Sequence, residues 1–296
     1  MDLPKDNQDK LRAEIAARAI NPAHESRLLS RHNLIPNTVG LAPGYLQVNL
    51  VVLPSAHASH FQDLCARNTV PCPLLGQTPI GDPTRILPEG VIKSPDFDIR
   101  TDFSSYRVFE GGVVTSPSQK DILAEWTDDS VGFLIGCSLS FEEALVENGL
   151  RVCHMEAGTV PAMYKTNIPV LPTGIFCDNA TYVVSMRTYK EEEIESVRDI
   201  TRPYLATHGE PVAWGWEGAK RIGIQDVHNP DFGAKQQFRE GEVPVFWGCG
   251  VTPQNVVAAA GTKIKGRVMS HEPGYMLITD LTISDLPRLS GKIEIR

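Results

Sequence analysis

The stretch FLIGCSLSFEEAL, residues 133–145, has a gapless echo in VFWGCGVTPQNVV, residues 245–257. In both copies a short apolar run leads into Gly-Cys, and a hydroxyl residue, Ser140 or Thr252, follows three positions after the cysteine. Such apolar runs predict buried strands, and Ser and Thr are preferred at helix N-termini. The pattern therefore predicts two units of strand, glycine turn and helix, and with them an α+β (mixed α/β) fold.

The predicted helix starts place unpaired backbone N–H groups and a positive dipole end beside Cys137 and Cys249. Three interpretations stay open. The cysteines are small apolar residues in a crowded turn, or they line an anion-binding pocket, or they face each other across a substrate as acid and base. The residues expected to contact a substrate at these helix starts are Ser138, Gly250, Thr252 and Gln254.

A second echo concerns the segments APGYLQVNL, residues 42–50, and EPGYMLITDL, residues 272–281. The order PGY, GCS, GCG, PGY along the chain is not that of a tandem array. We therefore expect two pseudo-symmetric, interlocked lobes with mixed sheets and covering helices, within a single domain of residues 1–296. The seam between the lobes is the expected ligand site.

Two segments near the N-terminus have clear patterns of their own. The mostly apolar run YLQVNLVVL, residues 45–53, predicts a buried strand. Apolar residues at helical spacing between Leu11 and Ile20 predict an amphipathic helix, and residues 1–40 are expected to form a helical cover. A homodimer is the expected assembly.

The composition restricts the class of protein. The chain of 296 residues has a formal net charge of -8 and no run of Lys or Arg, so we expect no nucleic-acid partner. No apolar run approaches the ~20 residues of a membrane span, and the first residues mix acids and bases. We therefore expect no membrane association and a cytoplasmic location. The sequence has no C-x-x-C pair and no dinucleotide or P-loop motif, so no nucleotide cofactor is expected.

Several segments between about residue 42 and residue 281 follow one another in a recognisable series: APGYLQVNLVVLP, YRVFEGG, VGFLIGCSLSFEEAL, VPAMYKTN, YVVSMR, IGIQDV, EVPVFWGCGVTPQ and HEPGYMLITDL. In this order they resemble the D-glutamate cyclase family, whose members are also described as hydro-lyases. The resemblance implies closure of D-glutamate, a small carboxylate substrate, to 5-oxo-D-proline with loss of water. It also implies a divalent metal ion, Mn or Mg.

Under this resemblance the chemistry requires groups that move protons. The candidates are His271, Asp226 and His208, beside the two cysteines, with His154 as a further candidate. A histidine can equally be a satisfied structural residue, so each assignment is a hypothesis.

The substrate's carboxylates and the metal require other groups. Arg187 and Lys165 are the cations expected to bind a carboxylate, and Tyr164 could add a phenol hydrogen bond. Asp226 and Asp280 are the candidate metal ligands, since Mn and Mg accept hard oxygen donors.

Two other classes of function remain open. A cofactor-independent amino-acid racemase or epimerase would use Cys137 and Cys249 as its acid–base pair. A non-enzymatic binding protein for an acidic metabolite would keep the anion sites and need no titrating residue.

Overall fold

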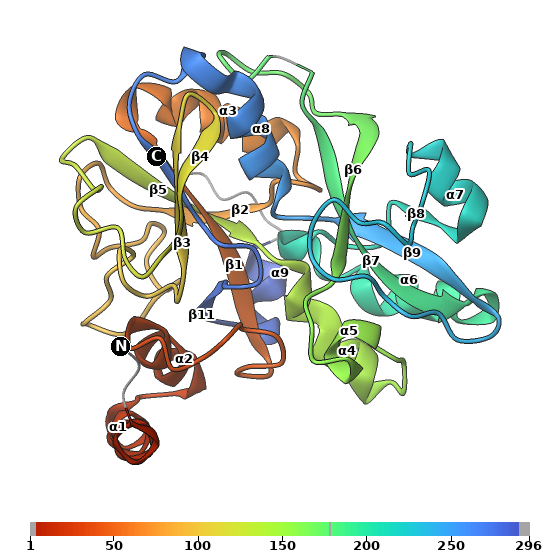
Figure 1. Cartoon of the computed structure of the whole chain (residues 1–296), viewed down its shortest axis with the longest axis horizontal. Helices are drawn as coiled ribbons and strands as arrows, with labels where there is room; N and C mark the ends of the chain where they lie inside the picture. Colours follow the sequence, from red (N-terminus) through yellow and green to blue (C-terminus); the bar gives the residue numbers. More distant parts are fainter. Residues whose placement is uncertain (1–3, 178, 290–296) are drawn as a thin grey trace.

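Two antiparallel β-sheets form the framework of the protein (Figure 1). The computed structural model describes residues 4–177 and 179–289. Within these residues the larger sheet has seven strands in the order β2-β5-β1-β10-β3-β4, with β11 also paired to β1. Its strands are β1 (Tyr45–Pro54), β2 (Leu74–Gln77), β3 (Tyr106–Glu110), β4 (Val113–Gln119), β5 (Ser130–Gly136), β10 (Val268–His271) and β11 (Leu277–Thr282).

The smaller sheet has four strands in the described part of the chain, in the order β6-β7-β9-β8. They are β6 (Ala162–Pro169), β7 (Thr181–Lys190), β9 (Glu242–Gly248) and β8 (Ala213–Trp214). β1 coincides with the predicted strand at residues 45–53, because a mostly apolar run can be buried on both faces.

Helices cover the sheets and connect them. The α-helices are α1 (Lys5–Arg18), α2 (Pro22–Arg31), α3 (Ala58–Arg67), α4 (Glu142–Glu147), α5 (Cys153–Glu156), α6 (Ile194–Thr201), α7 (Gly215–Arg221), α8 (Thr252–Ala260) and α9 (Leu286–Leu289). The 3-10 turns are η1 (Ser55–His57), η2 (Ser138–Phe141), η3 (Glu191–Glu193), η4 (Leu205–Thr207), η5 (Gly261–Lys263) and η6 (Ile283–Asp285). None of the described helices is both long and apolar enough to cross a membrane.

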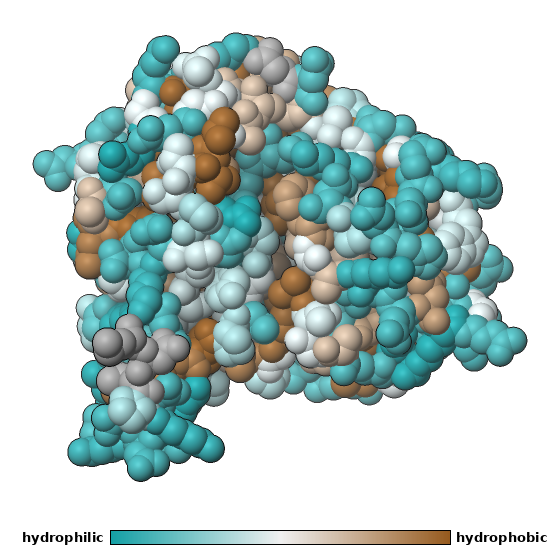
Figure 2. Space-filling model, viewed as in Figure 1, coloured by the Kyte–Doolittle hydropathy of each residue, from teal (hydrophilic) through white to brown (hydrophobic). Residues whose placement is uncertain are grey.

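The two sheets share one hydrophobic core. Leu50 of β1 and Leu134 of β5 belong to the same buried cluster as Val245 and Trp247 of β9. On the face seen in Figure 2, brown and tan residues gather where the two halves of the molecule meet, and much of the outer surface is teal. Because burial of apolar surface is the main favourable term in folding, this shared core fixes the two sheets against each other.

The N-terminal helices differ in how much they bury. α2 packs against β11, and Nη2 of its Arg27 lies 2.8 Å from Oδ2 of Asp280. α1 lies farther from the body in Figure 1 and has one buried residue, Ile15, among those described. Ile20, at the end of the predicted apolar stripe, is 58% exposed.

The two sequence echoes have different structural meanings. The GC segments end β5 and β9, so each sheet has one of them. The two PGY segments lead into β1 and β11, which pair with each other in the larger sheet. The α+β class is confirmed. The repeated PGY segments do not mark two similar lobes, because both belong to the larger sheet. The strand pairings among the described residues are antiparallel, whereas mixed sheets were predicted.

Candidate active site

Glycine is required by packing in both GC turns. A Cβ atom on Gly136, at the end of β5, would lie 1.9 Å from the carbonyl oxygen of Ala206. A Cβ atom on Gly248, at the end of β9, would lie 2.9 Å from the carbonyl oxygen of Val70 and 3.2 Å from Nδ1 of His208. Only a residue without a Cβ atom allows these approaches. The repeated glycine therefore has a structural reason in each copy.

Cys137 and Cys249 follow these glycines, and each is only 7% exposed. Burial raises the pKa of Cys137 to about 12 and that of Cys249 to about 11, although the amides of Leu139 and Val251 offset part of the rise. The thiolate is the reactive form of cysteine. Protonated, buried thiols favour the packing interpretation, and the acid–base pair stays a prediction.

The hydroxyl residues of the two copies bond to neighbouring strands. Oγ of Ser140 accepts the backbone N–H of Gln47 at 2.9 Å. Oγ1 of Thr252 accepts the N–H of Val183 at 2.9 Å and donates to its carbonyl oxygen at 3.1 Å. Neither η2 nor α8 has a side-chain cap, so the predicted capping role is wrong for both residues. Thr252 instead joins α8 to β7.

His271 fills a gap in the hydrogen-bond ladder of β1. This strand pairs with β10 at Val51 and with β11 at Val48. The N–H of Leu50, between these positions, donates to Nδ1 of His271 at 3.1 Å. Burial lowers the pKa of His271 to about 3, so the ring is neutral, and its hydrogen bond assigns the remaining proton to Nε2. The structure gives His271 a structural task, and its catalytic role stays a prediction.

His208, Gln254 and Gly250 are also engaged in packing. Nδ1 of His208 donates to the carbonyl oxygen of Val70 at 2.7 Å, and burial lowers the pKa of this ring to about 4. Nε2 of Gln254 donates to the carbonyl oxygen of His271 at 3.2 Å. A Cβ atom on Gly250 would lie 1.8 Å from Nδ2 of Asn49, so this glycine makes room for β1.

Arg187, on β7, is the centre of a buried polar network that joins the two sheets. Its Nη1 donates to Oγ of Ser185 at 2.7 Å and its Nη2 to Oγ of Ser138 at 3.0 Å. Its Nε donates to Oε1 of Glu142 at 3.0 Å, and its Nη2 contacts the same oxygen. The structure thus brings together Ser138 and Arg187, both predicted site residues, with Glu142, which was not predicted.

Glu142 has a second cationic partner in His154, on α5. Nε2 of His154 lies 3.0 and 3.2 Å from the two carboxylate oxygens. Burial alone would raise the pKa of Glu142, but the charges of His154 and Arg187 hold it below its ordinary value. Burial alone would lower the pKa of His154, but the charge of Glu142 raises it. Arg187 and, when protonated, His154 therefore place two cations against one largely buried carboxylate.

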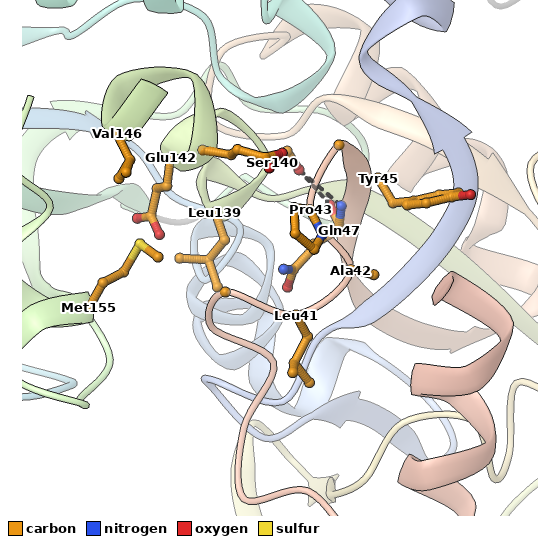
Figure 3. Close-up of a pocket in the computed structure, with 13 residues that line it drawn as sticks. Leu41, Ala42, Pro43, Tyr45, Gln47, Leu139, Ser140, Glu142, Val146 and Met155 are labelled. Atoms are coloured by element: carbon orange, nitrogen blue, oxygen red, sulfur yellow. Dashed lines mark hydrogen bonds between the residues drawn. The ribbon is translucent and has the colours of Figure 1, made fainter. Parts of the chain in front are cut away.

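A pocket of about 200 Å³ borders this network, between the start of β1 with the segment before it and the helices η2 and α4. Figure 3 shows Glu142 and Gln47 among the lining residues, with Leu139 between them in this view. Its polar lining residues are Gln47, Ser140, Glu142 and Glu143, and its apolar side chains include Leu41, Leu139, Val146 and Met155. Drug-sized ligands occupy ~300–1,000 Å³, so this pocket suits a small metabolite. Glu142 is the residue that links the pocket to Arg187 and His154.

Tyr164 and Lys165, predicted to bind substrate, do not line this pocket. The hydroxyl of Tyr164 donates to the carbonyl oxygen of Val227 at 2.6 Å, within the cluster that packs the smaller sheet against α7. Lys165 is exposed, and its Nζ lies 5.7 Å from the ring centroid of Phe232. Their role in binding stays a prediction.

Asp226 and Asp280, the candidate metal ligands, have separate partners. Asp280 is buried against Arg27 and also accepts the N–H of Lys93 at 2.7 Å. Asp226 is exposed and accepts the N–H of His228 at 2.8 Å. Within residues 4–177 and 179–289, no group of three or more His, Cys, Asp or Glu side chains is arranged to hold a metal ion. These two carboxylates do not fit a joint Mn or Mg site, and a metal requirement stays a prediction.

Two residues of the network and pocket were not expected from the sequence, Glu142 and Gln47. Glu142 stands in the run FEEAL, where a glutamate at a helix start normally faces water. Gln47 is a polar residue inside the predicted buried strand of residues 45–53. A polar side chain in such a strand needs a hydrogen-bond partner, and this could have identified Gln47 as a candidate. His154 was a candidate because of its residue type, and its partner was not predictable.

Comparisons with known proteins agree on one family. The sequence pattern of the D-glutamate cyclase family matches residues 131–280. "Putative hydro-lyase C5H10.01" of Schizosaccharomyces pombe is 48% identical over 281 residues, which cover 95% of this chain and 91% of that protein. "Putative hydro-lyase YcsI" of Bacillus subtilis is 47% identical over 244 residues, which cover 82% and 90%. The chain belongs to the D-glutamate cyclase family, and the hydro-lyase names of its relatives support a lyase.

Proposed function

We propose that the protein closes D-glutamate to 5-oxo-D-proline and water in the pocket beside Glu142. The observation that carries this proposal is the position of Glu142, which lines the pocket and is held by His154 and Arg187. The hydro-lyase names of the relatives support the class of reaction. The size of the pocket is consistent with a small amino acid.

The proposed reaction transfers protons from nitrogen to oxygen. The substrate nitrogen forms a bond to the γ-carboxyl carbon, and one γ-carboxyl oxygen leaves. The ammonium group starts with three protons and the lactam keeps one, so the other two depart with the oxygen as water. No oxidant, reductant or further reactant is required. The protein must therefore help to move both protons from the nitrogen to the departing oxygen.

The pair of Glu142 and His154 has the properties that this proton transfer requires. Glu142 faces the pocket, and His154 stores a proton 3.0 Å behind it, with a raised pKa. In the proposed mechanism the pair relays two protons in turn from the substrate nitrogen to the departing oxygen, with Glu142 as the group next to the substrate. Arg187 acts as a positioning residue, because it holds the Glu142 carboxylate in place.

The charge of the network also suits an acidic substrate. With His154 protonated, two cations surround one carboxylate, so the network carries a net positive charge. This charge offsets the repulsion between Glu142 and the carboxylates of the substrate, and it does so in a low-dielectric site, where charge interactions are strong.

The racemase alternative has less support. It requires a thiolate at Cys137 or Cys249, and burial raises the pKa of both thiols. A binding protein would use the same pocket without turnover, so turnover decides between these classes.

Proton NMR of the purified protein with D-glutamate, and separately with L-glutamate, tests the proposal. Spectra recorded in D2O with and without Mn²⁺ follow the signals of 5-oxoproline and of the Cα proton. We expect 5-oxoproline from D-glutamate. Loss of the Cα proton signal without ring closure would support the racemase instead, and no change with either isomer would contradict both reactions.

A further inference from the structure

A residue that lines the pocket beside Glu142 carries an amide oxygen that accepts no hydrogen bond from the described part of the chain. Gln47 is 3% exposed, and its Oε1 is buried with no hydrogen-bond partner among the described residues. A buried acceptor without a donor is costly, so such atoms usually mark the position of a ligand or water. Gln47 lines the pocket, which is where a donor could reach it.

The orientation of this amide is fixed by its neighbours. Nε2 of Gln47 donates to the carbonyl oxygen of Thr38 at 2.9 Å, and an amide turned the other way would place two oxygens together. The backbone of Gln47 is held as well, because its N–H donates to Oγ of Ser140 and its carbonyl accepts the N–H of Cys137 at 2.9 Å. The free oxygen is therefore preorganised to accept a hydrogen bond.

The rest of the pocket lining has the same preference for a donor. The carboxylates of Glu142 and Glu143 line it with Gln47, and none of the lining residues has a cationic side chain. The remaining walls include Leu41, Val146 and Met155, which suit the carbon chain of an organic molecule better than a hydrated metal ion. The oxygens of Glu142 are already engaged by Arg187 and His154.

We propose that this pocket binds a primary ammonium group on a small organic ligand, with Oε1 of Gln47 as the acceptor that recognises it. The inference rests on the proposed function and deepens it, because it places the ammonium group of the substrate beside Glu142. A primary ammonium has three N–H donors, which suit an amide oxygen and two nearby carboxylates. An analogue that lacks the amine leaves Gln47 without a donor.

Ligand affinity, measured at the start of the incubation before 5-oxoproline accumulates, tests this assignment. Saturation-transfer NMR with wild-type protein and the variant Gln47→Met compares D-glutamate with glutarate, which has both carboxylates but no amine. 4-Aminobutyrate serves as a second ammonium ligand. The ratio of the two affinities is the measured quantity, because general damage to the pocket would weaken both ligands. Gln62→Met is the matched control, since Gln62 also donates a side-chain hydrogen bond but lies on α3, away from the pocket.

We expect wild type to prefer D-glutamate over glutarate and Gln47→Met to reduce that preference about 10- to 100-fold, the factor for a hydrogen bond to a charged group. Gln62→Met should keep the preference of wild type. An unchanged preference in Gln47→Met, or no binding of either ammonium ligand to wild type, would overturn the proposal. Binding of Mg²⁺ or Mn²⁺ alone that is lost in Gln47→Met would overturn it in favour of a metal site. The proposed reaction fails separately, by absence of 5-oxoproline while D-glutamate still binds through Gln47.

Discussion

Glu142 carries its charge on a side chain that is almost fully buried. Its side chain is 3% exposed, and Arg187 and His154 keep it ionised. An unpaired buried carboxylate would cost several kcal/mol, so the carboxylate and its two cations form one unit. The contact between Glu142 and Arg187 joins residues 45 positions apart, and only the folded chain creates it. The sequence predicted Arg187 as a carboxylate-binding residue from its type, but it did not identify Glu142 as the partner.

The variant His154→Asn tests the charge state of this unit. A raised histidine pKa contributes stability that is fully present below about pH 6.5 and is lost as the pH rises through the raised value. The lowered pKa of Glu142 contributes stability that is fully present above about pH 4.5 and is lost as the pH falls through the lowered value. The pair therefore stabilises the protein most between about pH 4.5 and 6.5.

Urea unfolding of wild type and His154→Asn at several pH values measures this contribution. We expect the difference in unfolding free energy to be largest in that window and to shrink as the pH rises above it. Subtracting the variant from wild type removes the effect of the other histidines. A difference that does not change with pH would mean that His154 is not charged in the folded protein.

At the scale of elements, each GC turn joins a strand to a helix where another backbone passes close by. The strands were predictable, because β1, β5 and β9 are mostly apolar runs that are buried along nearly their whole length. The helix caps were not, because local capping rules compete with tertiary partners. Ser140 and Thr252 bond to β1 and β7 instead of to their own helices. The repeated Gly-Cys pair indicated that glycine is needed at both turns. The reason, close contact with η4 at Gly136 and with Val70 at Gly248, could not be predicted from the sequence.

Replacing Gly136 with Ala should destabilise the protein by about 1–3 kcal/mol or more, since the added methyl group would overlap the carbonyl oxygen of Ala206. Gly218→Ala, in α7, is the matched control. Its nearest neighbours to an added Cβ atom are 3.7 Å away, and Ala is favoured over Gly in a helix by ~0.5–1 kcal/mol. Urea unfolding of both variants checks the pair. Equal stability of Gly136→Ala and wild type would show that the turn is not closely packed.

At the scale of the whole molecule, the candidate site exists because two sheets of different size share one core. Arg187 extends from β7 of the smaller sheet. It bonds to Ser138 and Glu142, which follow the end of β5 in the larger sheet. The seam was predicted as the ligand site, and the pocket lies beside this junction. The residues that line the pocket come from β1 and the segment before it, from η2 and α4, and from α5, so no single motif encodes it. The expected homodimer stays a prediction.

The rate of 5-oxoproline formation from D-glutamate, measured by proton NMR for wild type, Glu142→Gln and Glu147→Gln, tests the central claim most directly. Glu147 is an exposed carboxylate at the end of the same helix and serves as the control. Circular dichroism during thermal unfolding shows whether each variant is folded at the assay temperature. Glu142→Asp is a further variant, which keeps the carboxylate. We predict that Glu142→Gln loses at least about 100-fold in rate, the scale of a proton-transfer group, while Glu147→Gln matches wild type. A folded Glu142→Gln protein that turns over D-glutamate at the wild-type rate would contradict the account.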